Sequence, residues 1–242
     1  MNIVIAKRAL KNEWSMLFIY FISNFFSGCS FSQPNVSQYN LQNAFYIDAI
    51  NGDDAHSGKS PAQAWKTLAK VNSQVFKPGN KLLFKAGTKL VGQLKIQGAG
   101  AKDKLIIINR YGKGPKPKIS ANGLHQAALL LYNTQYIQVN NLDISNQGES
   151  RQAKRYGVQI EIADFGTANG ISLRNLDVHD VNGSNVKKEG GGAGIHWINR
   201  GQKVKSAFDG LLIENCKIER TDRNGITSSA ILTAVIGSRA GM

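Results

Sequence analysis

An eleven-residue pattern that occurs three times constrains the fold of this chain more than any other feature. The copies span 136–146 (YIQVNNLDISN), 170–180 (GISLRNLDVHD) and 210–220 (GLLIENCKIER). In each copy apolar residues alternate at period two, which indicates strands, and a shared Asn breaks the alternation. Each copy is therefore predicted to form a strand, an Asn corner and a second strand.

Aligning the copies produces three apolar columns and one asparagine column. The columns are Ile137, Ile171 and Leu211; Val139, Leu173 and Ile213; Ile144, Val178 and Ile218; and Asn141, Asn175 and Asn215. Offsets of 34 and 40 residues are too long for hairpins and suit one solenoid coil plus a loop of variable length. We therefore predict an all-β fold, a right-handed parallel β-helix, in which the asparagines form a structural ladder.

A second family of strands lies between the copies and supplies the candidate functional surface. Its members span 156–161 (YGVQIE), 193–198 (AGIHWI) and 224–228 (NGITS), each with Gly in second position. A shared register predicts an inward column and an outward row. The inward column is Val158, Ile195 and Ile226, and the outward row is Gln159, His196 and Thr227.

The beginning of the chain differs in composition from the rest. Basic residues precede an apolar run at 17–26, and small residues follow, a pattern typical of a signal peptide and too short to span a membrane. Small residues before Gln33 suit a freely secreted protein, whereas Phe26-Ser27-Gly28-Cys29 resembles a lipoprotein box. We predict a signal peptide at 1–32, a linker at 33–43, and a secreted, periplasmic or cell-surface protein, the last with an outer-membrane lipid anchor at Cys29.

The β-helix domain is predicted at 44–242, with different expectations for its two ends. An open solenoid end exposes apolar core, so an N-terminal cap is expected at about 44–80. Ser60-Pro61 predicts a short capping helix that runs to about Val71 and buries Trp65. After 224–228 no further Asn unit follows before Met242, so the C-terminal end is expected to be incomplete, as in a truncated product.

Cysteine content and charge narrow the classes of function. The two cysteines are Cys29 in the leader and Cys216 in a core column, which excludes a disulfide framework in the mature chain. Lys and Arg outnumber Asp and Glu by 30 to 16, and the net charge of +14 favours polyanionic partners. An export signal without a nucleic-acid motif argues against nucleic acid. The expected partner of this monomer is an acidic polysaccharide.

The order of segments resembles a known class of proteins. Residues 45–72 (FYIDAINGDDAHSGKSPAQAWKTLAKVN) and 76–87 (FKPGNKLLFKAG), followed by the NGI and NL-D-I units, are similar to secreted bacterial right-handed β-helix proteins related to polysaccharide lyases. The similarity covers about 44–228. It implies that a long carbohydrate is bound or cleaved in a groove along one parallel sheet.

The same resemblance implies β-elimination from a uronic acid. This reaction needs the carboxylate neutralised by Ca²⁺ or Arg, and a Lys, Arg or His base that removes the α-proton. The catalytic candidates are His196, Arg223 and Lys188; the substrate-binding candidates are Gln159, Thr227, Arg200 and Asp222; and the candidate calcium ligands are Glu161, Asp164 and Glu189.

Several alternatives stay open from the sequence. Asp222 and Arg223 equally suit a corner ion pair, and Lys188 and Glu189 suit a solvated loop. A glycoside hydrolase would require two carboxylates facing each other across the groove. A non-catalytic glycan-binding protein or an inactive truncated β-helix is the remaining alternative.

Overall fold

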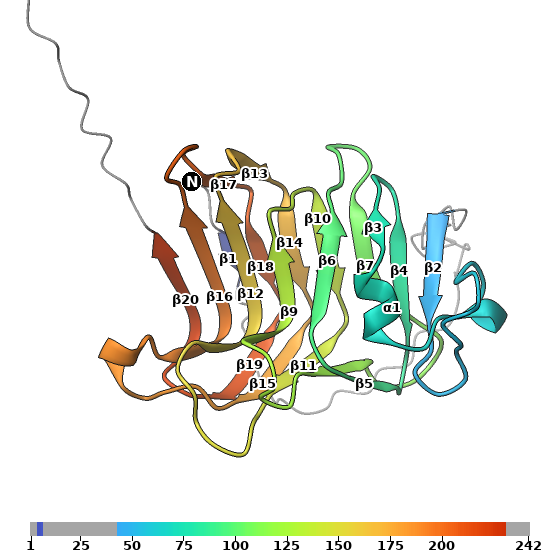
Figure 1. Cartoon of the computed structure of the whole chain (residues 1–242), viewed down its shortest axis with the longest axis horizontal. Helices are drawn as coiled ribbons and strands as arrows, with labels where there is room; N and C mark the ends of the chain where they lie inside the picture. The colour runs from blue at the N-terminus through green and yellow to red at the C-terminus, as the bar shows by residue number, and fades with distance from the viewer. Residues whose placement is uncertain (1–3, 7–42, 231–242) are drawn as a thin grey trace, which may run out of the picture.

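The chain is almost entirely β-structure. A computed structural model describes residues 4–6 and 43–230, and its strands run side by side along one long axis (Figure 1). The predicted all-β class is confirmed. Every pairing between the named strands is parallel.

Three large sheets contain nearly all of the strands. The first sheet has the order β1 (Val4–Ala6), β18 (Leu212–Glu214), β14 (Ile171–Arg174), β10 (Ile137–Asn140), β7 (Ile106–Tyr111), β4 (Lys81–Lys85) and β2 (Ala44–Ile47). The second has the order β19 (Lys217–Thr221), β15 (Asp177–Val181), β11 (Asp143–Asn146), β8 (Lys118–Ser120) and β5 (Lys89–Val91). The third has the order β20 (Asn224–Ala230), β16 (Gly192–Arg200), β12 (Arg155–Ala163), β9 (Ala127–Tyr132), β6 (Leu94–Gly98) and β3 (Val75–Phe76). A small pair, β13 (Thr167–Asn169) and β17 (Ala207–Asp209), lies outside them.

The chain visits the three sheets in a fixed order. From β4 onward each coil contributes one strand to the first sheet, one to the second and one to the third, and the next coil begins beside the previous one. This arrangement is consistent with a solenoid of the β-helix kind. The loops before the third sheet lie at the lower edge of the molecule in Figure 1, whereas β13 and β17 lie at the upper edge.

The predicted columns of apolar residues are present in the sheets. Ile137 pairs with Ile171, Val139 pairs with Leu173, and Ile144 pairs with Val178. The third copy continues this register through Ile213 and Ile218. All but the half-buried Ile218 are buried in one continuous core. Burial of such side chains contributes about 1.5–3 kcal/mol each, so the repeat itself stabilises the stack.

The asparagine column forms the corner between the first and second sheets. Asn141, Asn175 and Asn215 have φ of 55°, 53° and 52°, in the left-handed region that Asn tolerates better than most residues. The backbone N–H of Asn141 donates to Arg174 of the next coil at 3.2 Å, and that of Asn175 donates to Glu214 at 3.1 Å. The corner role is confirmed, although these two bonds between coils are made by backbone groups. A side-chain rung joins Asn141 to Asn109 at 2.9 Å.

The predicted capping helix is shorter than the sequence pattern suggested. Residues Pro61–Gln63 form one 3₁₀ turn, and the α-helix α1 spans only Leu68–Asn72. Between them Trp65 is extended, forms a bridge to Ile47 of β2, and exchanges backbone hydrogen bonds with Tyr46 and Asp48. The expected continuous helix was wrong because strand pairing competes for Trp65. Its indole is buried against Phe45, as a cap residue requires.

Two predictions on the periphery lie largely outside the described residues. The predicted signal peptide, apart from β1, the linker up to residue 42 and the last residues 231–242 belong to this part of the chain. Within the described ranges, no helix has the length and apolar character needed to cross a membrane. Cys216 is half-buried in its column, and desolvation raises the pKa of its thiol, as expected for a small core residue.

Candidate functional site

The outward row predicted from the sequence is present on the third sheet. Gln159 of β12 pairs with His196 of β16, and His196 pairs with Thr227 of β20. Gln159 and His196 are each only 4% exposed, while Thr227 is half-buried. The row therefore lies on the outer face of the sheet beneath neighbouring side chains, rather than open to solvent as the alternation suggested.

Two glycines set the orientation of the strands that carry this row. A Cβ on Gly157 would lie 2.5 Å from Val178 Cγ1, and a Cβ on Gly194 would lie 2.5 Å from Ile218 Cγ2. Because the strands start this close to the second sheet, only glycine fits there. Tyr156, immediately before Gly157, packs with Ala127 and Ala193 in a small cluster separate from the main core. Gly157 and Val158 both face the core, so the alternation is broken here and Tyr156 lies on the outer face with His196.

Tyr156 and His196 form the aromatic part of the outer face. Their rings stack with centroids 4.4 Å apart and an interplanar angle of 14°. His196 Nε2 lies 3.2 Å from Ser229 Oγ, and its Nδ1 is buried without a hydrogen-bond partner among the described residues. Burial and the nearby Arg200 guanidinium lower the pKa of His196 to about 4, so the ring is neutral at pH 7.

Glu161 forms the charged part of the same face. Its carboxylate accepts a hydrogen bond from Gln159 Nε2 at 2.8 Å and one from Arg200 Nε at 3.0 Å. The Glu161 side chain is 20% exposed and that of Arg200 is 44% exposed, so both remain accessible to a ligand. We call Tyr156, Gln159, Glu161, His196, Arg200 and Ser229 the outer cluster. It combines an apolar ring with hydrogen-bond donors and acceptors, the mixture found in ligand sites.

The remaining predicted site residues are spread over both edges of the third sheet. Asp164 lies beyond the carboxyl end of β12, where its Oδ1 accepts the backbone N–H groups of residues 202–204 at 2.7–3.0 Å. These bonds lower the pKa of Asp164 and identify it as a turn residue. At the opposite edge, Lys188 is exposed on a 3₁₀ turn, and Glu189 accepts a hydrogen bond from Ser184 at 2.6 Å.

Asp222 and Arg223 do not form the corner ion pair that was one of the two alternatives for them. Asp222 pairs with Arg151 of a neighbouring loop at 2.7 Å, and Arg223 is exposed with φ of 71° beside Gly191. Thus the structure brings together Gln159, Glu161, His196 and Arg200, with Thr227 adjacent. It separates Arg223, Lys188 and Asp222 from them.

The three predicted calcium ligands do not converge. Glu161, Asp164 and Glu189 occupy three different places, and each accepts hydrogen bonds from protein groups. Across residues 4–6 and 43–230 no group of three or more His, Cys, Asp or Glu side chains is positioned to hold a metal ion. Calcium binding therefore stays a prediction, and the arrangement of these three carboxylates does not favour it.

A second charged surface covers the outer face of the second sheet. His179 lies 2.9 Å from Asp143 and 2.6 Å from Asp180, and Arg220 also pairs with Asp180 at 2.6 Å. Arg220 and His179 lower the pKa of Asp180 to about 2. Because these carboxylates are all engaged by neighbouring coils, the surface is best explained as a ladder of ion pairs that fixes the register.

Two members of the outer cluster were missed at the sequence level. Tyr156 was assigned to a strand start and Ser229 to the segment after the last strand. The Gly that follows Tyr156 was the available signal, because a crowded glycine in a strand marks a bend that re-aims its neighbour.

Comparisons with known proteins identify relatives of the same architecture. No family model matches the chain. The chain is 27% identical over 247 residues to a lacto-N-biosidase from Bifidobacterium longum subsp. longum, covering 75% of this chain and 15% of the relative. The structure matches that of the native GH136 lacto-N-biosidase from Eubacterium ramulus with a TM-score of 0.71 and 29% identity, over 77% of this chain and 36% of that one. Its selenomethionine derivative gives a TM-score of 0.64 and 27% identity, over 72% and 34% of the two chains.

These relatives sharpen the resemblance stated from the sequence. The fold similarity extends over about three quarters of this chain, whereas the chain spans only about a third of the solved relative and less than a sixth of the curated one. Both relatives are named as glycosidases rather than as lyases.

Proposed function

We propose that this chain is a carbohydrate-active protein of the glycoside-hydrolase kind, and that the outer face of its third sheet binds an oligosaccharide. The lacto-N-biosidase relatives support a hydrolase rather than the lyase that the sequence resemblance first favoured. Their shared fold also supports closure of the three sheets into a right-handed β-helix.

The outer cluster is the observation that carries this proposal. The tyrosine ring stacked on a neutral histidine forms a buried apolar floor beneath this face, since the two residues are only 6% and 4% exposed. Glu161 and Arg200 stand beside it as acceptor and donor, already oriented by their mutual 3.0 Å contact. Such pre-ordered groups bind sugar hydroxyls without a further cost of side-chain ordering.

The same geometry weakens the β-elimination hypothesis. A histidine whose pKa is about 4 is a poor acceptor for a carbon-bound proton, because general bases work best with a pKa near the operating pH. Arg200 is engaged by Glu161 rather than left to neutralise a uronate. A calcium-dependent lyase therefore remains the weaker alternative.

Hydrolysis by two carboxylates needs a partner for Glu161. Strands β6, β9, β12, β16 and β20 together contain one acidic residue, Glu161. A retaining or inverting pair requires a second carboxyl group about 5–10 Å away. In the described residues this face is accordingly assigned to substrate binding. Export, either as a freely secreted protein or with a lipid anchor at Cys29, and a monomeric state complete the proposal.

The test is a glycan panel with a matched pair of variants. The protein is titrated with oligosaccharides that lacto-N-biosidases cleave and with uronic-acid polymers, and released reducing ends and unsaturated ends are assayed separately. We expect the neutral oligosaccharides to bind, and Glu161→Gln to weaken binding by about tenfold, or 1.4 kcal/mol. Glu149→Gln, on an exposed loop, is the control.

Two outcomes would overturn the proposal. Absorbance from unsaturated ends, with or without calcium, would restore the lyase hypothesis. Equal binding by the wild type, Glu161→Gln and Glu149→Gln would remove the outer cluster from the binding surface.

A further inference from the structure

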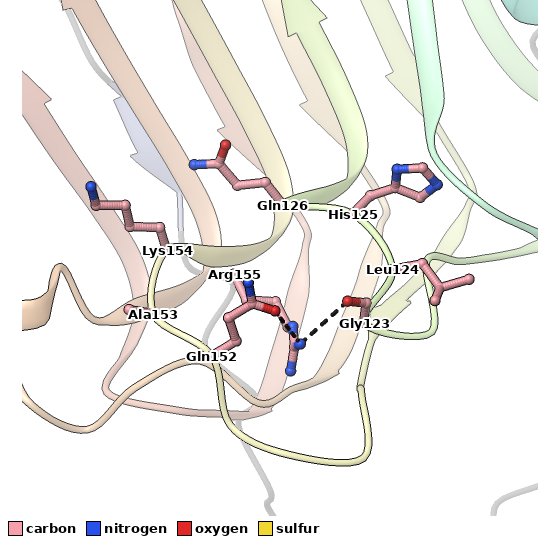
Figure 2. Close-up of a pocket in the computed structure, with 8 residues that line it drawn as sticks. All are labelled: Gly123, Leu124, His125, Gln126, Gln152, Ala153, Lys154 and Arg155. Atoms are coloured by element: carbon pink, nitrogen blue, oxygen red, sulfur yellow. Dashed lines mark hydrogen bonds between the residues drawn. The ribbon is translucent and has the colours of Figure 1, made fainter.

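A hollow of about 280 Å³ lies beside the amino ends of β9 and β12 (Figure 2). Two loops form it, one leading into each strand. The lining residues are Gly123, Leu124, His125, Gln126, Gln152, Ala153, Lys154 and Arg155. Its size is close to the lower limit of small-molecule sites, about 300 Å³, which suits one monosaccharide unit.

The lining of this hollow is cationic. Lys154 and Arg155 contribute two positive charges, and none of the eight lining residues is acidic. Glu149, the acidic residue of the second loop, does not line it. Figure 2 shows Lys154, Gln126 and His125 around the upper part of the hollow, with Arg155 and Gln152 below. An anion entering this space meets attraction without a competing carboxylate.

Three of the lining side chains are not engaged inside the protein. Among the described residues, the Lys154 ammonium, the Gln126 amide and the His125 ring make no hydrogen bond or ion pair. By contrast, Arg151 pairs with Asp222 and Arg200 pairs with Glu161. Donors left unpaired around one hollow are available to a ligand.

Arg155 gives the hollow a rigid and charged wall. It is 4% exposed, and its guanidinium makes five hydrogen bonds to oxygens of Gly123, Ser150, Gln152 and Asn182. Every one of these partners is a neutral carbonyl or amide oxygen. Desolvation lowers the pKa of Arg155, and none of these five hydrogen bonds is to a carboxylate. Because Arg155 is buried and its guanidinium is already hydrogen-bonded, it would attract an anion in the hollow through its positive field rather than by direct contact.

We propose that this hollow is a subsite for an anionic substituent of a sugar, a carboxylate or a sulfate, held by Lys154 in the field of Arg155. Gln126 and His125 contact the hydroxyl groups of the same sugar unit. The inference rests on the proposed function for the glycan that carries this unit, since Gln126 and Arg155 directly precede Ala127 and Tyr156 at the start of the outer face. A glycan lying along that face reaches the hollow with one end.

The experiment compares three ligands that differ in one group. An oligosaccharide ending in a uronic acid, its sulfated counterpart and its neutral parent are titrated calorimetrically into the wild type, Lys154→Gln and Lys205→Gln. Lys205 is exposed in the loop between β16 and β17, at the opposite edge of the third sheet from the hollow. Lys205→Gln removes one positive charge, as Lys154→Gln does, but it does so away from the hollow. All three proteins must show the same melting temperature.

We expect the anionic ligands to bind the wild type about tenfold more tightly than the neutral one. Lys154→Gln should remove most of this preference, whereas Lys205→Gln should retain it. Preference for the carboxylated over the sulfated ligand, or the reverse, identifies the natural substituent. Equal affinity for all three ligands, or equal losses in the two lysine variants, would overturn the proposal.

A free uronic acid monosaccharide separates this proposal from the one on which it rests. If it binds the wild type in a Lys154-dependent manner while Glu161→Gln has no effect on any oligosaccharide, the hollow stands and the outer cluster fails. If Glu161→Gln weakens the neutral oligosaccharide while no ligand responds to Lys154→Gln, the outer cluster stands and the hollow fails.

Discussion

Arg155 shows how a single side chain holds three successive coils together. Its hydrogen bonds reach the loop before β9 at Gly123, its own loop at Ser150 and Gln152, and the loop before β16 at Asn182. Gly123 and Gly148 make room for it, since a Cβ on either would come within about 3 Å of the guanidinium. The buried cation therefore positions the loops that form the hollow.

Replacement of Arg155 by methionine should destabilise the protein. The change keeps an extended apolar stem but leaves several buried carbonyl oxygens without donors, at a cost of about 1–3 kcal/mol for each group that water does not reach. We expect a loss of roughly 2–5 kcal/mol in urea unfolding. Arg151→Met, which breaks an exposed pair with Asp222, should cost under about 1 kcal/mol. Similar losses in both variants would show that Arg155 has no special role.

His196 should make stability depend on pH below neutrality. Its folded pKa of about 4 lies below the ordinary value of 6.5, so the unfolded chain binds the proton more readily. Stability is then fully present above about pH 6.5 and falls as the pH decreases toward 4, by up to about 3 kcal/mol from this residue. Urea unfolding at several pH values should show a shallower decline for His196→Gln. An NMR titration of His196 with a pKa near 6.5 would contradict the prediction.

The glycine near the start of β12, β16 and β20 is an element-scale constraint. At Gly194 a Cβ would approach Ile218 Cγ2 at 2.5 Å and the carbonyl oxygen of Gly225 at 2.8 Å. At Gly225 the nearest contact would be Ile218 Cγ2 at 3.6 Å, an ordinary van der Waals distance. Among the described residues, the same motif position is therefore crowded at Gly194 and open at Gly225.

This contrast predicts different effects of the same substitution. Gly194→Ala should destabilise the protein by about 1–3 kcal/mol, because backbone and core side chains must shift. Gly225→Ala should stay within about 1 kcal/mol of the wild type. Thermal and urea unfolding of the two variants measure the difference. If both alanines are tolerated equally, the strand start at Gly194 is not as closely packed as the distances indicate.

The sequence predicted strands and corners well but capping and loops poorly. Inward residues such as Val139 and Leu173 stack regardless of loop length, so a local pattern was enough to find their register. The conformation of Trp65 could not be predicted from a local pattern, because the residue pairs with Ile47, which is distant in sequence, although its neighbours have a helical pattern. Within the site, the shared register of the strands predicted the row that contains His196. The stacking of Tyr156 depends on a break in the alternation at Gly157, which a period of two does not predict.

At the scale of the whole molecule, the stacking of successive coils in parallel sheets places short repeats along one long outer face, with loops at both edges. Side chains far apart in sequence become neighbours by stacking, as Glu161 and Arg200 do across 39 positions. The hydrogen bonds of Arg155, in contrast, depend on the lengths and paths of three loops that are not part of the repeat. Aligning the copies of the repeat could therefore not predict them. The sequence therefore located the face but not the hollow beside it.

The net charge of +14 raises a competing explanation for any preference for anionic glycans. A diffuse field attracts polyanions from all sides and is screened over about 10 Å at 0.1 M salt. If this diffuse field dominated, Lys154→Gln and Lys205→Gln would reduce the affinity for anionic ligands equally.

If the hollow dominates, raising sodium chloride from about 50 to 200 mM should weaken the binding of the uronic-acid ligand to the wild type severalfold, while the binding of the neutral ligand stays unchanged. Calorimetry across this salt range should then show a smaller salt dependence for Lys154→Gln than for Lys205→Gln, because the former lacks the charge that contacts the ligand. Parallel salt dependences in the two variants would assign the attraction to the overall charge.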